Sequence, residues 1–480
     1  MPQQSTTAGL FSIRGTVYES LVGYDPSTGD HAVPMLAESW SRNDDSTVWT
    51  FNLRHGVQFQ RGAGEFTSAD VKFTWEILTR DSSLASDAAM LRSVVKSVDT
   101  PDPYTAIFNL NGPSNFANTQ VLWNSSMLIM SKNYYDRVGE KTYAREPVGT
   151  GPYVLKKWNP GAGMQFANFE DYWGTAPDFA ELDLRYVAED QTRVSMLQAG
   201  EADVIDLPRV LVDSVKSAGM DVAESVFPSV TMQLWFGSMY LPDVGGHPWK
   251  DPRVREALNL GFDREAISKG PLRGYAEPVA FTMLGPDSPG YKQIDRDPFP
   301  YDPQRAKQLL AEAGYSDGLD IDVKVPEIAG ISEVSTVIEG IAAQWNEIGV
   351  HVNIQKVDLA PIAKGYRARD DLPYIFVARS PYNLFDPKTT LNTLYSAAGA
   401  YGGTGDAEVE GLLKDASKTA DDAELGEIYV KIARRIYDNF ETIPLPAVTA
   451  LVAYNPKTVD TWIGTNASGL DGLTTLKHAG

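Results

Sequence analysis

The chain has 480 residues, of which 43% are hydrophobic and 22% are charged, and its formal net charge at pH 7 is −21. This length and composition predict a globular protein of roughly two to four domains. The acidic surface repels nucleic-acid phosphates, so we expect no nucleic-acid partner. The absence of cysteine excludes disulfides, thiolate nucleophiles and thiolate metal sites.

The first elements along the chain are a strand and a helix. Residues 47–53 (TVWTFNL) alternate between the two faces expected of a strand. Residues 67–70 (TSAD) form a capping box, which predicts that a helix begins here. Val71, Trp75 and Leu78 then share one face of that helix at helical spacing.

Residues 147–153 (PVGTGPY) raise the question of whether a glycine-rich loop cradles a phosphate. A phosphate-binding loop needs a helix behind it, and the following residues 153–158 (YVLKKW) have a strand pattern instead. No Lys-Ser or Lys-Thr pair follows the loop, so a nucleotide site is disfavoured. We expect Gly149 and Gly151 to supply positive φ angles at a tight entry into the strand.

Further helix starts are marked by an aspartate followed by proline. Asp251-Pro252 and Asp302-Pro303 each combine an N-cap residue with proline at the first helical position. The second of these helices is predicted over residues 303–313, because Gly314 is a typical helix stop.

Residues 320–357 contain the clearest supersecondary unit. The strand patterns DIDVKVP and VHVNI flank a helix from Ser332 to Glu347, which carries apolar residues at helical spacing and ends at Gly349. A strand, a helix and a strand over this length predict a right-handed crossover and a parallel strand pair. The fold class is therefore α/β with mixed sheets.

In order along the chain, these pieces resemble the extracellular solute-binding proteins of ABC importers, of the oligopeptide-, dipeptide- and nickel-binding type. The resemblance spans roughly residues 1–460, and it rests on the ordered set of matching stretches rather than on any one of them. Besides residues 320–357, these stretches are VYESLVGYDPSTGDHAVPMLAESWSRNDDSTVWTFNLRHGVQF, FTSADVKFTWEIL, PVGTGPYVLKKWNPG, DPRVREALNLGFDREAI and YDPQRAKQLLAEAGY.

The resemblance implies the two-lobed fold of periplasmic binding proteins, with the ligand held in a cleft between the lobes. Ligand binding would close the lobes, because the ligand touches both of them only in the closed form. The expected boundaries are a first lobe of residues 1–30, 148–237 and 459–480 with an inserted subdomain at 31–147, a second lobe of residues 245–453, and hinge crossings at 238–244 and 454–458.

The resemblance also implies which residues contact the ligand. In the second lobe, the cleft loop would contain Arg379, and Asn383 stands about where dipeptide receptors carry an aspartate that binds the ligand's ammonium group. An amide cannot supply that charge, whereas a guanidinium at Arg379 could hold an anionic group. An alternative role for Arg379 is an ion pair within the protein. The full set of expected ligand-binding residues is Phe11, Arg14, Trp235, Phe236, Arg379, Tyr382, Asn383, Phe385 and Tyr401.

Two of these positions carry further expectations. One of the neighbouring aromatics Trp235 and Phe236 is expected to belong to the core. Gly237, where the family usually has asparagine, could widen the cleft locally.

No arrangement of residues in the sequence indicates catalysis. There is no metalloprotease motif, nucleophile elbow or phosphate-binding loop. The histidines share no metal-ligand spacing, so we expect no metal and no cofactor; they are His31, His55, His247, His351 and His478. We therefore expect a binding protein and not an enzyme. The alternatives are a hydrolase of small peptides or glycosides, or a ligand sensor on the same fold.

The expected partners are a small-molecule or peptide ligand and the membrane permease of an ABC importer with its ATPase subunits. The sequence contains no apolar run of about 18 residues that could span a membrane. The stretch MPQQSTTAG lacks the basic and apolar regions of a signal peptide, which fits either a cytosolic protein or a signal already removed. With the resemblance, we expect a monomer in the periplasm or on the extracellular face of a bacterial membrane.

Overall fold

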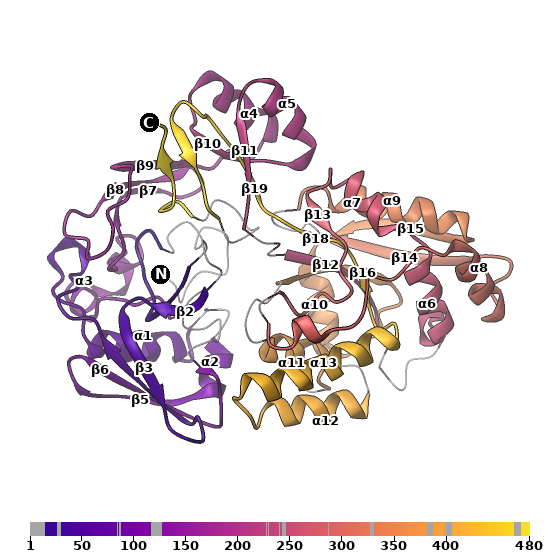
Figure 1. The fold of residues 1–480 in the computed structure, drawn as a ribbon, viewed down its shortest axis with the longest axis horizontal. Helices are drawn as coiled ribbons and strands as arrows, with labels where there is room; N and C mark the ends of the chain where they lie inside the picture. The colour runs from indigo at the N-terminus through magenta and orange to yellow at the C-terminus, as the bar shows by residue number, and fades with distance from the viewer. Residues whose placement is uncertain are drawn as a thin grey trace. The chain divides into compact units, whose positions relative to one another are not determined.

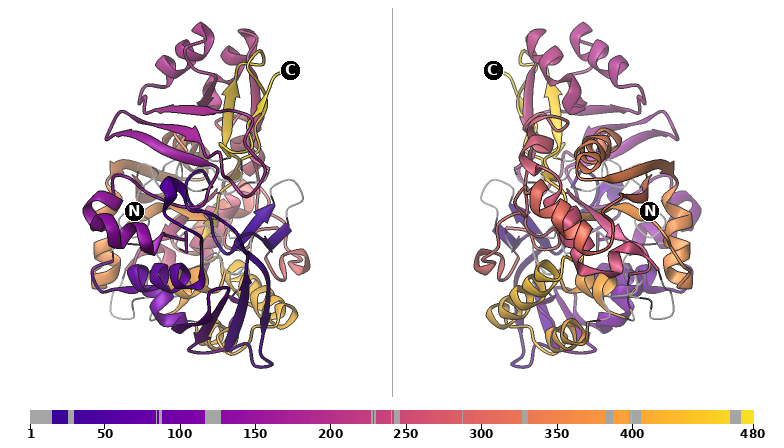
Figure 2. Two further views of the ribbon diagram at one scale, coloured as in Figure 1. Left: turned by 90° about the vertical axis from the view of Figure 1, so that its left-hand side faces the viewer. Right: turned by 90° about the vertical axis from the view of Figure 1, so that its right-hand side faces the viewer.

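A computed structural model describes residues 15–25, 30–83, 85, 88–116, 127–226, 228, 230–239, 241, 246–286, 288–326, 331–381, 387–397, 399, 406–464 and 472–480. The chain divides into two compact units. The first comprises residues 1–207, 212–226 and 451–480, and the second comprises residues 208–211 and 227–450. Both units combine helices with sheets (Figures 1 and 2), which confirms the α/β fold class.

The first unit contains a four-stranded antiparallel sheet of order β3-β4-β6-β5, the three-stranded antiparallel sheets β7-β8-β9 and β10-β19-β11, and the strand pairs β1-β2 and β20-β21. Its elements are β1 (Val22–Asp25), β2 (Asp30–Pro34), β3 (Ala37–Arg42), β4 (Val48–Leu53), η3 (Gln60–Gly62), α1 (Ser68–Thr79), α2 (Ala88–Val94), β5 (Val95–Asp102), β6 (Thr105–Leu110), α3 (Lys132–Tyr143), β7 (Tyr153–Asn159), β8 (Gly163–Asn168), β9 (Glu181–Arg185), α4 (Asp190–Ala199), β10 (Val204–Asp206), α5 (Val212–Ser217), β11 (Asp221–Glu224), β19 (Leu451–Tyr454), β20 (Val459–Thr461) and β21 (Lys477–His478).

The core of the first unit lies between the four-stranded sheet and the helices α1 and α2, which pack on β5 and β6. The alternation in residues 47–53 buries Trp49, Phe51 and Leu53 from β4 on one face. Phe51 meets Phe108 of β6 edge to face, with ring centroids 5.5 Å apart. The predicted capping box is present at the start of α1, where the backbone N–H of Thr67 donates to Asp70 Oδ2 at 2.9 Å.

The glycine-rich loop leads into strand β7, as predicted, but the reason for its glycines differs from the prediction. Neither Gly149 nor Gly151 has a positive φ angle. Instead the loop lies against residues 16–18, and a Cβ on Gly151 would stand 2.5 Å from the carbonyl oxygen of Thr16. The buried amide of Gln60 donates to the carbonyl oxygens of Gly151 and Tyr153, both at 2.8 Å. The glycines therefore allow a close approach of two backbone segments.

The second unit is built around a seven-stranded mixed sheet of order β13-β18-β12-β16-β14-β15, with β17 also paired to β12. Its elements are η6 (Arg209–Leu211), β12 (Val230–Phe236), η7 (Pro248–Lys250), α6 (Pro252–Leu260), α7 (Arg264–Lys269), β13 (Ala276–Glu277), η8 (Tyr291–Gln293), α8 (Pro303–Glu312), β14 (Leu319–Pro326), α9 (Val334–Glu347), β15 (Val350–Val357), α10 (Leu359–Ala368), β16 (Ile375–Pro381), α11 (Lys388–Tyr395), α12 (Ala407–Ala416), α13 (Asp422–Asp438), β17 (Ile443–Pro444) and β18 (Ala447–Val448).

The predicted strand–helix–strand unit is confirmed in the second unit. Strands β14 and β15 pair in parallel along their whole length, and α9 packs on both. The proline helix starts are also confirmed: the side chain of Asp251 accepts from the N–H of Arg253, and that of Asp302 accepts from the N–H of Arg305, both at 2.9 Å. A second apolar cluster joins Trp235 and Phe376 of the sheet to side chains from α10, α11, α12 and α13.

The chain passes from one unit to the other at 207/208, 211/212, 226/227 and 450/451. This division differs from the expected lobe boundaries at β12, which was expected in the first lobe. Strand β12 pairs with β16, β17 and β18 along its length, so its backbone hydrogen bonds belong to the sheet of the second unit. The division also differs at strand β19, which was expected in the second lobe and at the start of the hinge crossing. This strand pairs with β10 and β11 in the first unit.

Candidate ligand-binding site

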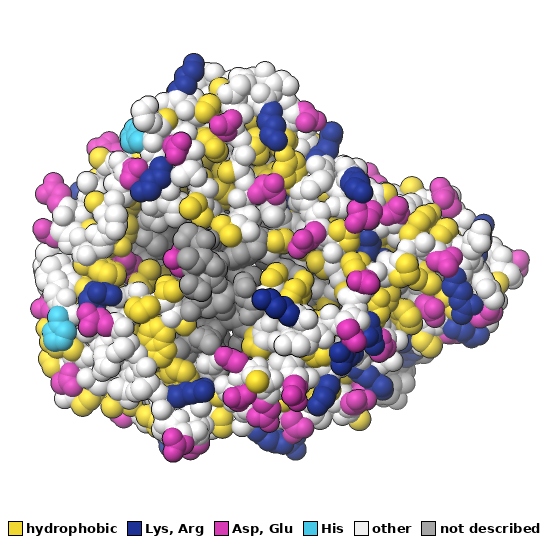
Figure 3. All heavy atoms as spheres, viewed as in Figure 1, with side chains coloured by type: hydrophobic (Ala, Val, Ile, Leu, Met, Phe, Trp, Pro, Cys, Tyr) yellow, Lys and Arg dark blue, Asp and Glu magenta, His cyan; other side chains and the backbone are white. Residues whose placement is uncertain are grey.

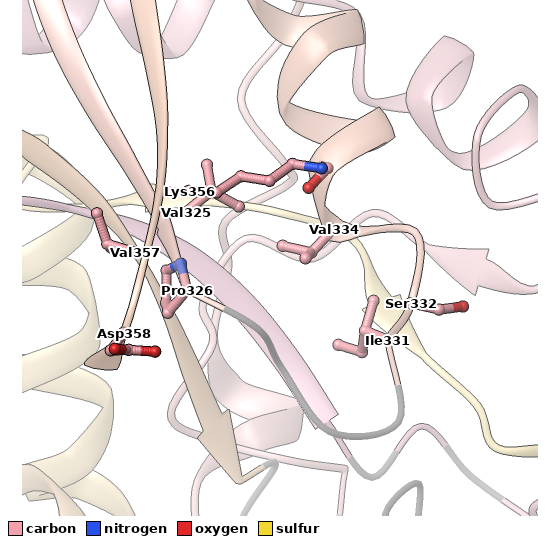
Figure 4. Close-up of a pocket in the computed structure, with 9 residues that line it drawn as sticks. Val325, Pro326, Ile331, Ser332, Val334, Lys356, Val357 and Asp358 are labelled. Atoms are coloured by element: carbon pink, nitrogen blue, oxygen red, sulfur yellow. The ribbon is translucent and has the colours of Figure 1, made fainter. Parts of the chain in front are cut away.

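Three parallel strands of the second unit end at the same edge of its sheet. Strand β14 pairs in parallel with β15 on one side and with β16 on the other. Ligands of open α/β sheets commonly bind beyond this carboxyl edge, because the loops and helix starts that follow the strands converge there. The end of β14, the start of α9 and the end of β15 surround a pocket of about 640 Å³ (Figure 4), lined by Val325, Pro326, Ile331, Ser332, Val334, Ser335, Lys356, Val357 and Asp358.

Lys356 brings a positive charge into this pocket. It stands beside Val325 in the strand register, so both side chains lie on the sheet face that carries α9. Figure 4 shows the Lys356 side chain reaching toward the start of α9, near Val334, while Asp358 lies on the other side of the pocket. Within the part of the chain that the structure describes, Lys356 makes no ion pair. The positive end of the α9 dipole adds to the positive potential of the Lys356 ammonium group. Together, the dipole and the ammonium group favour binding of an anionic group.

Arg379 extends the same row of side chains on the neighbouring strand. Val323 of β14 stands beside Ile375 of β16, so Arg379, four residues further along, lies on the face that carries Val323 and α9. Its side chain is exposed, and the residue lies within β16 and not in the loop after it. Arg379 already takes part in an interaction within the chain, so a ligand there would share or replace a contact.

The two predicted aromatics of β12 lie in the core of the second unit. Trp235 is 3% exposed and stacks on Tyr395, with ring centroids 5.5 Å apart. Phe236 is 2% exposed and stacks on Trp249 at 6.2 Å. This burial favours a packing role for both side chains.

Gly237 follows these aromatics, and the expectation that it widens a cleft is wrong. Its N–H donates to the carbonyl oxygen of Tyr374 at 3.0 Å, and an added Cβ would stand 2.6 Å from that same oxygen and would collide with the carbonyl of Leu372. The glycine therefore lets the segment after β12 approach the segment before β16 closely, and the position of a side chain there is filled by backbone.

The remaining predicted ligand contacts lie outside the described residues, and they are Phe11, Arg14, Tyr382, Asn383, Phe385 and Tyr401.

Sequence reasoning missed Lys356, although a signal was present. In β15 the residues facing α9 are Val350, Val352 and Ile354, and the next residue in that row is Lys356. A charge that interrupts an apolar row at the carboxyl end of a parallel strand is a reason to suspect a ligand contact.

A buried carboxylate in the first unit was also missed. Glu19 is 2% exposed, and it accepts hydrogen bonds from Tyr172 Oη and Trp173 Nε1, both at 2.8 Å. Burial raises the pKa of Glu19 to about 7, although these donors and the nearby charge of Arg54 act in the opposite direction. The guanidinium of Arg54 lies over the Trp173 ring, 4.6 Å from its centroid.

Comparison with known proteins places the chain in a family. Residues 31–402 match the family described as bacterial extracellular solute-binding proteins, family 5. The chain belongs to this family. Its members are ligand-binding components of ABC importers, so the chain is a solute-binding receptor.

Similarity to individual proteins and to solved structures extends along nearly the whole chain. The chain is 29% identical over 474 residues to the glutathione-binding protein GsiB of Salmonella paratyphi A, covering 94% of this chain and 87% of that protein. Its fold matches the ABC transporter substrate-binding protein CtaP of Listeria monocytogenes, with a TM-score of 0.85, 21% identity and coverage of 100% and 96% of the two chains. HbpA2 of Haemophilus parasuis matches with a TM-score of 0.81, 24% identity and coverage of 99% and 97%.

These structural matches show that the chain has the two-lobed fold of periplasmic binding proteins. Among the described residues, no helix has the length and apolar character needed to cross a membrane. In the same residues, no group of three or more His, Asp or Glu side chains is arranged to hold a metal ion.

Proposed function

We propose that this receptor captures a small polar solute that carries an anionic group, such as an oligopeptide or a peptide-like molecule, and delivers it to the permease and ATPase subunits of an ABC importer. The observation that carries the proposal is the position of Lys356 in a pocket at the carboxyl edge of the sheet, facing the positive end of α9. Arg379 on the same sheet face supports it.

The anionic group would bind between Lys356 and the first turn of α9. Ser332 and Ser335 line the same pocket and offer hydroxyl groups to a ligand oxygen. Asp358, across the pocket, could accept a hydrogen bond from an ammonium or hydroxyl group of the same ligand. A pocket with one cation and one carboxylate suits a zwitterionic molecule, and amino acids and peptides are of this class.

The lobes would close on the ligand as in the family resemblance, with residues 31–147 proposed as an inserted subdomain of the first lobe, β19 in the first lobe and β12 in the second lobe, in keeping with the sheets that these strands join. Ligand contacts from the first lobe would come from Phe11 and Arg14. Those from the loops of the second lobe would come from Tyr382, Asn383, Phe385 and Tyr401. Trp235 and Phe236 would act through packing.

The test begins with native mass spectrometry of freshly purified protein, which identifies a co-purified solute by its mass. Glutathione is the first probe for calorimetric titration, because the curated relatives at 28–29% identity are named for binding it. Carboxylate-bearing peptides and the corresponding peptide amides complete the panel. We expect a solute with a carboxylate to bind and its amide to bind more weakly.

A pair of variants locates the anionic group. Lys356→Met should weaken binding of the acidic ligand by roughly 10-fold or more, because a charge-assisted hydrogen bond is lost. Lys324→Met is the matched control, since Lys324 lies on the other face of the same sheet, with its Nζ 3.6 Å from the centroid of the Tyr374 ring. Equal affinity of the Lys356 variant and the wild type for every binding solute would contradict the proposed site.

We further infer that the protein binds its solute without transforming it, acts as a monomer outside the cytoplasm and does not bind nucleic acid. On the face shown in Figure 3, acidic and basic side chains are interspersed. The net charge of −21 disfavours binding to nucleic-acid phosphates. Incubation of the bound solute with purified protein, followed by mass spectrometry, tests the first point. Conversion of the solute over several turnovers would favour the hydrolase alternative.

A further inference from the structure

Arg209 is a buried cation at an unusual place in the chain. It lies in η6, within the segment 208–211 that clusters with the second unit, although the residues on both sides belong to the first unit. Its side chain is 3% exposed. Residues 208–211 are flanked on both sides by residues of the first unit. Such a short segment therefore needs specific contacts to remain packed on the second unit.

Glu333 of the second unit provides these contacts. The backbone N–H of Arg209 donates to Glu333 Oε1 at 2.8 Å, and its Nη1 donates to Oε2 at 3.3 Å, so both carboxylate oxygens are used. Glu333 is also 3% exposed, and it is the N-cap residue of α9. The guanidinium also donates to the carbonyl oxygens of Tyr275 and Thr449.

The contact with Thr449 joins two of the places where the chain changes units. Thr449 is two residues before the crossing at 450/451, and Arg209 is two residues after the crossing at 207/208. On the first-unit side of these crossings, the N–H of Leu207 donates to the carbonyl oxygen of Leu451 at 3.0 Å, continuing the β10-β19 ladder. Hydrogen bonds thus join the segments around residues 207–209 and 449–451 on both sides of the positions where the chain passes between the units.

A gain in folding free energy alone gives little reason for a buried ion pair such as Arg209–Glu333. Desolvating two charges costs about as much as their attraction returns, and well-packed apolar side chains of similar size serve equally well or better. A buried pair does fix one arrangement of the segments that carry it, because any other arrangement leaves a charge without its partner.

We propose that Arg209 and Glu333 form a conformational pin, which fixes the crossing segments to the second unit and so narrows the range of arrangements that the two units sample. Since Glu333 lies between the pocket residues Ser332 and Val334, the pin also fixes the first turn of α9 at the proposed ligand pocket. That second role rests on the proposed function, whereas the effect on the units does not require any ligand.

The experiment uses the ligand-free protein. Because the chain has no cysteine, spin labels can be attached at two introduced cysteines, Lys141→Cys in the first unit and Glu347→Cys in the second, both at exposed positions. Double electron–electron resonance then gives the distribution of distances between the units. In the variant Arg209→Met/Glu333→Leu, which replaces the pair with apolar side chains, we expect a broader distribution. The melting temperature is measured beside it, because the backbone N–H of Arg209 and the carbonyl oxygens of Tyr275 and Thr449 lose their side-chain partners in this variant.

Two further variants make the result specific to the pin. Glu333→Gln keeps the size of the side chain and removes its charge, so it should broaden the distribution even if the double variant folds poorly. Arg264→Lys is the matched control, because Arg264 is another buried arginine of the second unit, with 3% exposure and contacts to the carbonyl oxygens of Asn259 and Pro444, far in sequence from the crossings at 207–227. It should leave the distribution as in the wild type.

A wild-type distance distribution in both Arg209→Met/Glu333→Leu and Glu333→Gln would overturn the pin. Equal broadening in Arg264→Lys would also overturn it, since the effect would then follow from general loosening of the second unit. Neither outcome depends on whether the protein binds an anionic solute, so failure of the pin and failure of the proposed function are distinguishable.

Discussion

Glu19 is a carboxylate in a place where water cannot solvate its charge. Because its pKa is raised from 4.5 to about 7 in the folded protein, the folded state holds the proton more tightly than the unfolded state. The resulting stabilisation is fully present below about pH 4.5, and it is lost as the pH rises through about 7. For a shift of this size the loss is on the order of 3 kcal/mol.

We therefore predict that the free energy of unfolding of the wild type falls between pH 5 and 8 more steeply than that of Glu19→Gln. Glutamine does not titrate, although its amide N–H₂ cannot accept a hydrogen bond from Tyr172 or Trp173. Urea unfolding followed across this pH range measures both slopes, and the difference between the slopes is independent of any constant loss caused by the substitution. Parallel curves would show that Glu19 keeps an ordinary pKa in solution.

A ligand-binding role and a structural role of Arg379 predict different effects of its substitution on ligand affinity and on melting temperature. If it holds an anionic group of the solute, Arg379→Ala should weaken binding about 10- to 150-fold, the equivalent of a charge-assisted hydrogen bond of roughly 1.5–3 kcal/mol. Arg379→Lys should recover only part of the affinity, because lysine lacks the planar fork.

Calorimetric titration of both Arg379 variants with the solute identified by mass spectrometry measures these affinities, and thermal melts run beside it. An unchanged affinity together with a lowered melting temperature in Arg379→Ala would assign Arg379 to an interaction within the protein.

At the scale of elements, local signals were sufficient to predict much of the structure. The capping box at Thr67, the proline starts of α6 and α8, and the β14-α9-β15 unit all follow from patterns within about 40 residues, and each is present. These signals depend on backbone groups that are near in sequence, so the rest of the fold does not alter them.

The features that sequence reasoning predicted wrongly or missed depend on contacts between distant segments. Gly149 and Gly151 touch residues 16–18, and Gly237 touches residues 372–374, so their reason for being glycine lies outside their own loops. The burial of Trp235 depends on Tyr395, which is 160 residues away in a helix that the sequence pattern did not indicate. Aromatic content alone does not separate a core residue from a ligand contact.

The loop before β7 provides a test of why its glycines are needed, either for a close approach to residues 16–18 or for a positive φ angle. Gly151→Ala should lower the free energy of unfolding by roughly 1–3 kcal/mol, because its methyl group would meet the backbone of Thr16, which cannot move aside. Gly112→Ala is the control, since a Cβ there meets nothing within 4 Å and the residue has no positive φ.

Denaturant unfolding of both glycine variants measures the difference. Gly112→Ala should be neutral or slightly stabilising. Equal effects at the two positions would mean that the loop does not press on residues 16–18. Specific binding of ATP or NAD that is abolished by Gly151→Ala would restore the phosphate-loop interpretation.

At the scale of the whole molecule, the family assignment predicts a change on ligand binding. A ligand that contacts both lobes only in the closed form must shift the population toward that form. We predict a smaller radius of gyration in solution when the ligand is at saturating concentration, as measured by small-angle X-ray scattering. Superimposable curves with and without ligand, under conditions where calorimetry shows binding, would contradict closure.

The place of β19 in its sheet has a consequence for how the protein is made. Strand β19, residues 451–454, is the central strand between β10 and β11, which lie more than 220 residues earlier in the chain. During synthesis or export, the first unit therefore waits for nearly the entire chain before this sheet can form, and the two outer strands meanwhile expose unpaired backbone groups. The second unit shares this delay only in part, because β17 and β18, residues 443–448, pair with β12 late in the chain, whereas β12, β14, β15 and β16 all lie within residues 230–381. We therefore expect the β12-β16-β14-β15 part of that sheet to form first, and the β10-β19-β11 sheet to be the one that chaperones must protect.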